Sequence, residues 1–217
     1  MTRPNRADGL ETRRAILRTA ADLASVDGLE GITIGRLATE LGMSKSGLFA
    51  HFGSKEDLQL ATIEHARQRY VDEVLSPALS EPAGIVRLQA LCESFLSYVA
   101  RDVFPGGCFF AATMAEYDGK PDGPVRDLVA DCQEQWMGTL ERTAARAREE
   151  GQLRPGCDPR QLAFELEAAL LAANWYVHLH HDASFLDRAR QAVHTRLTAE
   201  ATARGRTALG SVRQRRG

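Results

Sequence analysis

The sequence lacks the features that mark secreted, membrane-spanning and metal-binding chains. Its 217 residues include only four cysteines, with no CxxC pair and no histidine at zinc-finger spacing, which is typical of reduced thiols in the cytosol. The longest apolar stretch, residues 168–177, is interrupted by Asn174 and is far shorter than the roughly 20 residues of a membrane span. The first residues, MTRPNRADGLETRR, contain no apolar core of a signal peptide. We therefore expect a cytoplasmic protein with no membrane partner.

The motifs of common enzyme classes are also missing. The chain contains no G-x-S-x-G, P-loop, dinucleotide fingerprint or H-E-x-x-H motif, so we expect no catalytic residues and no cofactor. The segment HLHHD places His178 and His181 three residues apart, but the sequence supplies no third ligand for a metal ion. We interpret this segment as a solvated helix end, where histidine complements the helix dipole, and predict no metal site.

Aromatic residues make up only 6% of the chain, and no segment has a convincing strand pattern. Alanine, leucine, arginine and glutamate dominate instead, and these residues favour helices. The hydrophobic fraction of 44% is sufficient for a sizeable core. The patterns predict an all-α fold, with helices over approximately residues 10–26, 34–41, 45–52, 54–75, 83–101, 108–117, 123–151, 159–181 and 184–204.

The charge is unevenly distributed along the chain, although the net charge is only -2. Residues 1–18 carry five arginines against two acidic residues, and residues 203–217 carry five arginines and no acidic residue. Basic ends on an acidic body indicate that any contact with a polyanion is local. The alternative is that the C-terminal tail, residues 204–217, only keeps the chain soluble. We expect this tail to be disordered.

Residues 32–52, ITIGRLATELGMSKSGLFAHF, have the spacing of a helix-turn-helix motif. The small side chain of Ala38, next to Leu37, allows two helices to cross closely. Gly42 can adopt the left-handed conformation of the turn, and Leu48 anchors the second helix on the shared core. The second helix would then present its N-terminal face to the major groove of DNA.

This N-terminal face carries short polar and basic side chains. Hydroxyl groups can bond base edges or phosphates, and Lys45 can pair with a phosphate or with guanine. Thr33 and Lys55 flank the motif at helix N-termini, where free N–H groups favour a phosphate. The alternative is that Thr33 and Ser54 act only as helix caps. The predicted DNA-binding residues are Thr33, Ser44, Lys45, Ser46, Gly47, Phe49, His51 and Lys55.

The longer stretch of residues 11–65 resembles the N-terminal domain of the TetR family of transcriptional regulators. The likeness includes a first helix that ends at a glycine, the entry segment TIGRLA, and the block GMSKSGLFAHFGSKEDL at residues 42–58. The resemblance implies that the eight predicted residues lie at or near DNA. The arginine-rich arm before the first helix, with Arg3 and Arg6, is expected to add minor-groove or phosphate contacts.

Two positions depart from the pattern of the family. Phe49 stands where a tyrosine is common, so it can pack against sugar but cannot donate a hydrogen bond to a phosphate. Gly47 likewise replaces a frequent threonine or serine. These departures leave an alternative open, a helical interaction protein that kept the fold but lost DNA binding.

The resemblance also implies that the second half of the chain dimerises and binds an effector. The last two predicted helices would form a bundle of four helices between two subunits. One face of the first of them is small and apolar, which suits close packing, although it could also pack only within its own chain. This face consists of Ala163, Leu166, Ala169, Leu170 and Ala173.

An effector pocket is expected among the apolar residues of the central helices, where it would suit a small hydrophobic or amphipathic molecule. Each of these residues could instead belong to the core. A redox role for Cys108, at a helix N-terminus, lacks an evident resolving cysteine. The candidate pocket residues are Phe95, Phe104, Cys108, Phe109, Met114 and Trp136.

The sequence therefore predicts a transcriptional regulator with three segments. Residues 1–60 form a three-helix DNA-binding domain, which a long fourth helix joins to a helical effector-binding and dimerisation domain at residues 61–203. Residues 204–217 form the basic tail. We expect a repressor that binds a near-palindromic DNA operator as a homodimer and leaves it when the effector binds.

Overall fold

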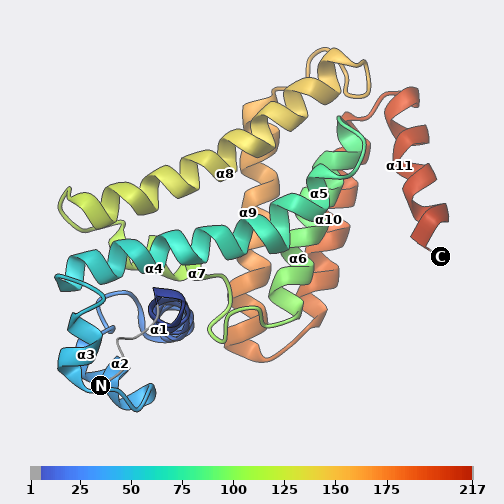
Figure 1. The fold of residues 1–217 in the computed structure, drawn as a ribbon. Coiled ribbons are helices and arrows are strands. Elements are labelled where there is room, and N and C mark those ends of the chain that lie inside the picture. The colour runs from blue at the N-terminus through green and yellow to red at the C-terminus, as the bar shows by residue number, and fades with distance from the viewer. Residues whose placement is uncertain (1–5, 217) are drawn as a thin grey trace. The chain divides into compact units, whose positions relative to one another are not determined.

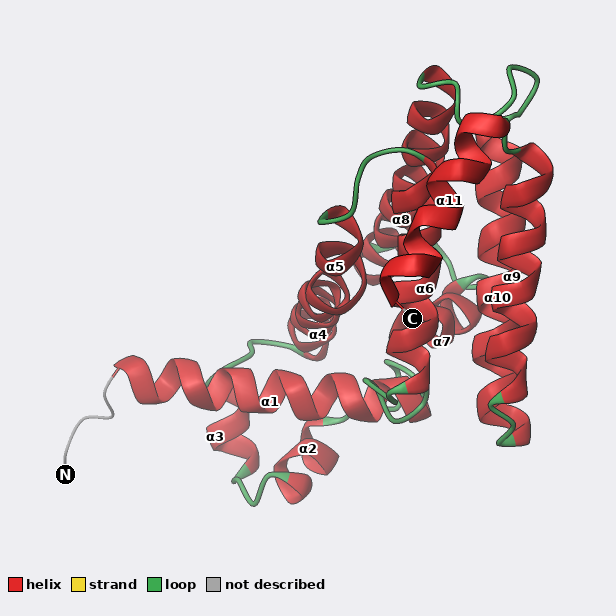
Figure 2. Cartoon of the chain, turned by 90° about the vertical axis from the view of Figure 1, so that its right-hand side faces the viewer, coloured by secondary structure: helices red, strands yellow, loops and turns green. Residues whose placement is uncertain are grey.

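Eleven α-helices and one π-helical turn make up the described part of the chain (Figure 1). The computed structural model describes the backbone of residues 6–216 and the side chains of residues 9–210. This part contains no strand (Figure 2). It has one isolated antiparallel bridge, between Leu153 and Ala201. The predicted all-α fold is therefore confirmed. The elements are α1 (Arg6–Asp27), α2 (Ile34–Glu40), α3 (Lys45–Phe49), α4 (Lys55–Tyr70), the π-helical turn (Val71–Leu75), α5 (Ser76–Leu79), α6 (Ile85–Ala100), α7 (Phe109–Tyr117), α8 (Pro124–Glu149), α9 (Pro159–His180), α10 (Ser184–Glu200) and α11 (Ala203–Arg216).

The helices form two compact units, each built from two stretches of sequence. Unit 1 consists of Met1–Arg69 with Phe104–Cys132, and unit 2 consists of Tyr70–Val103 with Gln133–Gly217. The predicted domains, residues 1–60 and 61–203, are each one continuous segment. These units are not continuous, because α7 packs against α1 within unit 1. Among the described residues, no helix is long and apolar enough to cross a membrane.

The core of unit 1 joins α1 to the short helices that follow it. Ile16, Ala20 and Ala24 lie on one face of α1 and are completely buried. Leu37 of α2 and Leu48 of α3 are equally buried. Because full burial of a leucine or isoleucine side chain contributes about 1.5–3 kcal/mol, this shared core holds the two short helices, which are too short to be stable alone.

Three hydrogen bonds attach the segment around α7 to the chain around the C-terminal end of α1. The Gly106 N–H donates to Ser25 Oγ at 3.0 Å, before α7 begins. At the end of α7, the Glu116 carboxylate accepts from the backbone N–H groups of Leu29 and Glu30 at 2.7 and 2.9 Å. Both ends of this segment are therefore tied to the chain around the end of α1.

Unit 2 has an aromatic core. The ring of Tyr70 packs edge-on against Tyr98 and Trp136, with ring centroids 5.6 and 5.5 Å apart. Phe95 stacks on Trp136 at 6.3 Å. In the same unit, α9 and α10 lie side by side and bury Leu166, Leu170, Val193 and Leu197.

The fourth helix differs from its predicted end near Leu75. α4 ends at Tyr70, and the chain continues through the π-helical turn into α5, which contains Pro77 at its start. The Ser76 N–H donates to the carbonyl oxygen of Val71, five residues back. Proline removes one donor and its ring clashes with the carbonyl four residues earlier, so the wider turn lets the helical path continue past Pro77.

Both ends of the chain also differ from expectation. The first helix begins at Arg6, ahead of the predicted start near Leu10. The tail expected to be disordered forms α11 instead. Thr202 caps the start of this helix, because its Oγ1 accepts from the Gly205 N–H at 3.2 Å. Leu209 of the helix is buried. The composition of the tail did not reveal this cap or this buried leucine.

Candidate nucleic-acid interface

Helices α2 and α3 pair around a tight turn, as the helix-turn-helix spacing predicts. Ala38 and Leu48 are buried between them. Gly42 has a φ of 62°, in the left-handed region that favours glycine. At this turn the Met43 N–H donates to the Ala38 carbonyl oxygen at 2.9 Å, which closes the end of α2. Gly42 therefore forms the turn and the small residue Ala38 lies in the buried core, as the sequence pattern predicts.

Hydroxyl side chains cap the helices of the motif. Thr33 Oγ1 accepts from the Arg36 N–H at 3.2 Å at the start of α2. Ser44 Oγ accepts from the Gly47 N–H at 3.0 Å at the start of α3. At the start of α4, Ser54 Oγ accepts from the Asp57 N–H at 3.0 Å. The capping role of these side chains is present, and Ser44 Oγ also lies 3.2 Å from Ser46 Oγ.

The predicted DNA-binding residues gather on the surface of unit 1. Thr33, Ser44, Lys45, Ser46, Phe49 and Lys55 are exposed, and Gly47 and His51 are partly exposed. Phe49 keeps 51% of its surface exposed, although an aromatic ring of this size is normally packed. A Cβ at Gly47 would lie 3.1 Å from Ser44 Oγ, so glycine leaves room for the cap of α3.

The two lysines of the site have different surroundings. The end of the Lys45 side chain passes over Gly35 of α2, and it forms no salt bridge among the described residues. Lys55 Nζ donates to a carboxylate oxygen of Glu30 at 2.7 Å and to its carbonyl oxygen at 3.0 Å. Of the expected N-terminal arm, Arg3 and the side chain of Arg6 lie outside the described residues.

Comparison with known proteins identifies both halves of the chain. Residues 16–62 match the family described as "Bacterial regulatory proteins, tetR family", and residues 84–193 match "Tetracyclin repressor-like, C-terminal domain". The chain belongs to the TetR family. Its predicted role as a DNA-binding transcriptional regulator with a helix-turn-helix domain is therefore confirmed.

Individual known proteins are similar to this chain at modest identity. A TetR regulator from Chloroflexus aurantiacus is 26% identical, with a TM-score of 0.83 over 90% of this chain and 98% of that one. AibR, solved with isovaleryl coenzyme A and operator DNA, is 26% identical, with a TM-score of 0.60 over 76% and 85%. The nucleoid occlusion factor SlmA of Marinobacter nauticus is 29% identical over 70% of this chain and 73% of its own length.

The candidate effector residues of this TetR-family chain fall into two clusters, one in each unit. Phe104 and Phe109 are in contact in unit 1, with ring centroids 5.7 Å apart, and Cys108 and Met114 lie in the same stretch of chain. Phe95 and Trp136 belong to the aromatic core of unit 2. All six are buried except Met114, which is half-buried.

A buried carboxylate lies beside the aromatic cluster of unit 2. Glu167 of α9 is only 6% exposed and accepts hydrogen bonds from Trp136 Nε1 at 2.6 Å and Gln133 Nε2 at 3.3 Å. Burial raises the pKa of this carboxyl group, which the two hydrogen bonds oppose. A polar group among aromatic rings is typical of sites that bind small amphipathic molecules. Sequence reasoning missed Glu167, because a glutamate in a helical segment resembles any residue of a solvated helix face.

The small apolar face of α9 is not the free surface that the dimer prediction assumed. Ala163, Leu166, Leu170 and Ala173 are buried within this chain, and Ala169 is half-buried. The exposed apolar residues of α9 are instead Phe164, Trp175, Tyr176 and Leu179. Helical periodicity locates an apolar face but does not show which neighbour covers it, so the residues of the exposed stripe were missed.

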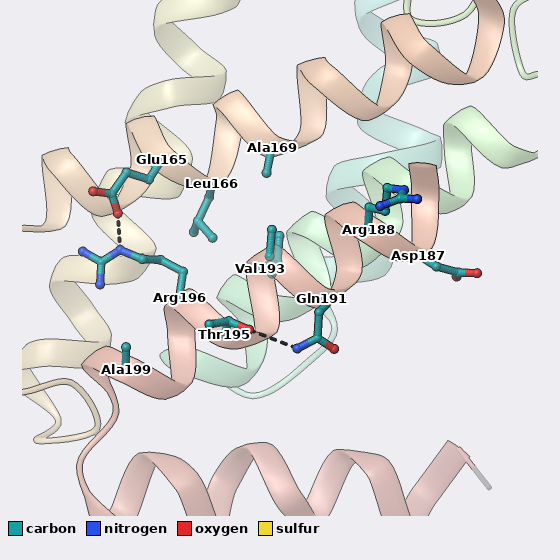
Figure 3. A pocket seen from close by; sticks show the side chains of 11 residues that line it. Glu165, Leu166, Ala169, Asp187, Arg188, Gln191, Val193, Thr195, Arg196 and Ala199 are labelled. Carbon is teal, nitrogen blue, oxygen red and sulfur yellow. Dashed lines mark hydrogen bonds and ion pairs between the residues drawn. The ribbon is translucent and has the colours of Figure 1, made fainter. Parts of the chain in front are cut away.

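An open groove runs along α9 and α10 in unit 2 (Figure 3). Its volume is about 930 Å³, and Leu166, Ala169 and Val193 form part of its floor. Arg196 donates to Glu165 at one end of the groove, and Gln191 donates to Thr195 at 3.0 Å (Figure 3). We call this surface the α9–α10 groove.

The segment HLHHD forms the end of α9. His178 and His180 lie in the last turn, and His181 adopts a left-handed conformation with a φ of 53°. The rings of Tyr176, His180 and Phe185 contact one another, with the His180 centroid 5.6 Å from Tyr176 and 5.9 Å from Phe185, and those two 4.9 Å apart. The segment is therefore a helix end with an aromatic stack.

Proposed function

We propose that this TetR-family regulator is a repressor that binds a near-palindromic operator as a homodimer and is released by a small hydrophobic or amphipathic effector. The observation that carries the DNA site is the exposed, capped face of α3, where Ser44, Lys45 and Ser46 stand free of the core while Leu48 fixes the helix. Short hydroxyls and a lysine on one helix end suit base edges and phosphates.

Replacing Lys45 and Lys55 by alanine should weaken DNA binding by about tenfold for each lysine. The slope of log affinity against log salt should also become shallower, by about 1 for each phosphate that the variant no longer neutralises. Fluorescence anisotropy with the DNA upstream of the chain's own gene, measured across a salt series against a scrambled duplex, gives both quantities.

The matched control is Arg160→Ala, which removes one exposed positive charge from unit 2. This variant should bind DNA as the wild type does. Unchanged affinity in the Lys45→Ala, Lys55→Ala double variant would refute the assignment of these residues. Equal binding of both duplexes by the wild type would instead favour a regulator whose operator lies elsewhere, which selection from random DNA would identify.

The homodimer is proposed from the exposed apolar stripe of α9. Phe164, Trp175 and Leu179 retain 63%, 51% and 72% of their surface exposed, and their spacing places them along one side of the helix. A row of exposed apolar side chains of this size is typical of a protein interface. Together with the α9–α10 groove it forms a surface on which two copies could pack about a twofold axis.

Phe164→Glu should raise the dimer dissociation constant at least about tenfold, because each subunit would bury a charge at the interface. Sedimentation velocity over a concentration series measures this. Leu79→Glu, which changes an exposed leucine of α5 in the same unit, is the control and should leave the dimer intact. A dimer that tolerates Phe164→Glu would show that α9 is not the interface.

The effector site is proposed in unit 2, around Phe95 and Trp136 with Glu167 as the polar group. Aromatic rings would contact the apolar part of a ligand, and the carboxylate would orient a polar group. The structure of AibR with isovaleryl coenzyme A and operator DNA supports such a link between ligand and DNA in a related protein. Phe104, Cys108, Phe109 and Met114 of unit 1 remain predicted pocket residues.

A further inference from the structure

Lys55, the proposed phosphate-binding lysine at the start of α4, already has an anionic partner. Its Nζ lies 2.7 Å from Glu30 Oε2 and also donates to the Glu30 carbonyl oxygen at 3.0 Å. Both side chains are nearly half exposed. An ammonium group has three donors, and two of them are directed at Glu30 in this structure. A DNA phosphate at Lys55 would therefore meet a carboxylate already in place.

Glu30 is held in position by the rest of unit 1. Its backbone N–H donates to Glu116 at 2.9 Å, and the Tyr117 hydroxyl donates to Glu30 Oε1 at 3.1 Å. Lys120 Nζ lies 3.6 Å from the same carboxylate oxygen. The hydrogen bond from Lys55, together with that from Tyr117 and the nearby lysine charges, lowers the pKa of Glu30 to about 2 despite some desolvation. The carboxylate is therefore charged and directed at Lys55 at any physiological pH.

The glycine before this turn makes the arrangement possible. Gly28 has a φ of 78°, and a Cβ there would lie 2.7 Å from Glu116 Oε2. The same oxygen accepts from the Leu29 N–H at 2.7 Å. Glu116 thus fixes the backbone of the turn, and the turn fixes where Glu30 can reach.

We infer that Glu30 limits the affinity of this protein for DNA by competing with the DNA phosphate for Lys55. The inference rests on the proposed phosphate contact of Lys55. Binding requires the ammonium group to leave Glu30 or to be shared with the phosphate, and in either case part of the attraction between Lys55 and Glu30 is lost. Glu30 thus keeps the contact weak, and neutralising it should strengthen binding.

The test is a double-mutant cycle on the full chain with Glu30→Gln, Lys55→Ala and the combination of both. Binding to a short duplex of random sequence at low salt is a sufficient probe, because phosphate contacts do not depend on sequence. Glu30→Gln should bind about threefold to tenfold more tightly than the wild type. In the Lys55→Ala background the same substitution should give less than about a twofold gain, since its partner is missing.

The control variant Glu56→Gln removes the charge of the next residue after Lys55, which forms no salt bridge among the described residues. It should change affinity by less than about twofold. An equal gain from Glu56→Gln, or an undiminished gain in the Lys55→Ala background, would show a general charge effect and overturn the inference.

The remaining outcomes separate this inference from the proposed DNA site. If Lys55→Ala loses DNA affinity as expected but Glu30→Gln gains none, the competition by Glu30 is refuted and the phosphate contact of Lys55 stands. Unchanged affinity in Lys55→Ala would overturn the phosphate contact and the competition with it. Circular dichroism of each variant establishes that the helices are intact, and Glu30→Gln keeps the size of the side chain that Tyr117 contacts.

Discussion

Replacing Gly106 by alanine should lower the free energy of unfolding by about 3 kcal/mol. A Cβ at this position would overlap the backbone carbonyl group of Ser25 and lie 2.8 Å from the backbone nitrogen of Val26. A flexible side chain could move away from such a contact, but these atoms belong to the backbone of the last turn of α1. The loop cannot move away freely either, because the Gly106 N–H donates to Ser25 Oγ. Urea unfolding followed by circular dichroism measures the loss.

Gly119→Ala is the matched control for this substitution. A Cβ at Gly119 would meet no atom within 4 Å, and its φ is not in the left-handed region. Its effect should stay within about 0.5 kcal/mol, since alanine there changes mainly the entropy of the unfolded chain. A Gly106→Ala variant as stable as Gly119→Ala would mean that the loop before α7 shifts at little cost, contrary to its close approach to Ser25.

The contact at Gly106 anchors one end of the α7 segment. The other end is anchored by Glu116 on the turn that carries Glu30. Hydrogen bonds therefore connect α7 to the turn between α1 and α2, and through Glu30 to Lys55, within unit 1.

The parts of the fold that local sequence determines were predicted well. The small residue Ala38, the turn glycine Gly42 and the cap Ser44 each act within a few residues of their own position, so their spacing is sufficient to locate the helix-turn-helix. The bounds of α6 to α9 and the start of α10 follow for the same reason, because capping residues, glycine and proline punctuate the sequence, whereas α10 ends at Glu200 rather than near Arg204.

The parts that depend on distant contacts could not be predicted. Glu30 is separated from Lys55 by 25 positions and from Tyr117 by 87, and nothing in its neighbourhood distinguishes it from other exposed glutamates. The apolar face of α9 was visible, but whether its own chain covers it depends on where α10 packs. The helical tail was missed because a single cap and one buried leucine decide it.

Replacing Glu200 by glutamine should cost about 2–3 kcal/mol of stability at neutral pH. The Glu200 side chain is only 2% exposed, and its carboxylate accepts from Arg154 Nη2 at 2.7 Å and from Arg196. Arg196 also donates to Glu165, at the edge of the α9–α10 groove (Figure 3). Glutamine keeps the size of the side chain but leaves the two guanidinium groups without their shared counter-charge.

The cost of this substitution should depend on pH in a defined direction. Hydrogen bonds from Arg154 and Arg196, with their charges, lower the pKa of Glu200 to about 2, although desolvation opposes them. The pKa of a glutamate in an unfolded chain is about 4.3, so the folded state prefers the ionised form. This contribution is complete well above pH 4.3 and is lost as the pH falls toward 2. The difference between wild type and Glu200→Gln should therefore be about 1 kcal/mol smaller at pH 3.5 than at pH 7.

Urea unfolding of both proteins at the two pH values tests this expectation, with Glu134→Gln as the control. Glu134 is exposed on α8 in the same unit and has no salt bridge among the described residues, so its neutralisation should change stability by less than about 0.5 kcal/mol at either pH. Other carboxylates with lowered pKa values, such as Glu30, titrate in both proteins and cancel in the difference. An equal loss at pH 7 and pH 3.5 would mean that Glu200 contributes through packing. A loss of stability that is smaller in acid would instead show that Glu200 acts through its charge. That charge holds together Arg154, which precedes α9, and Arg196 of α10, beside the proposed dimer surface.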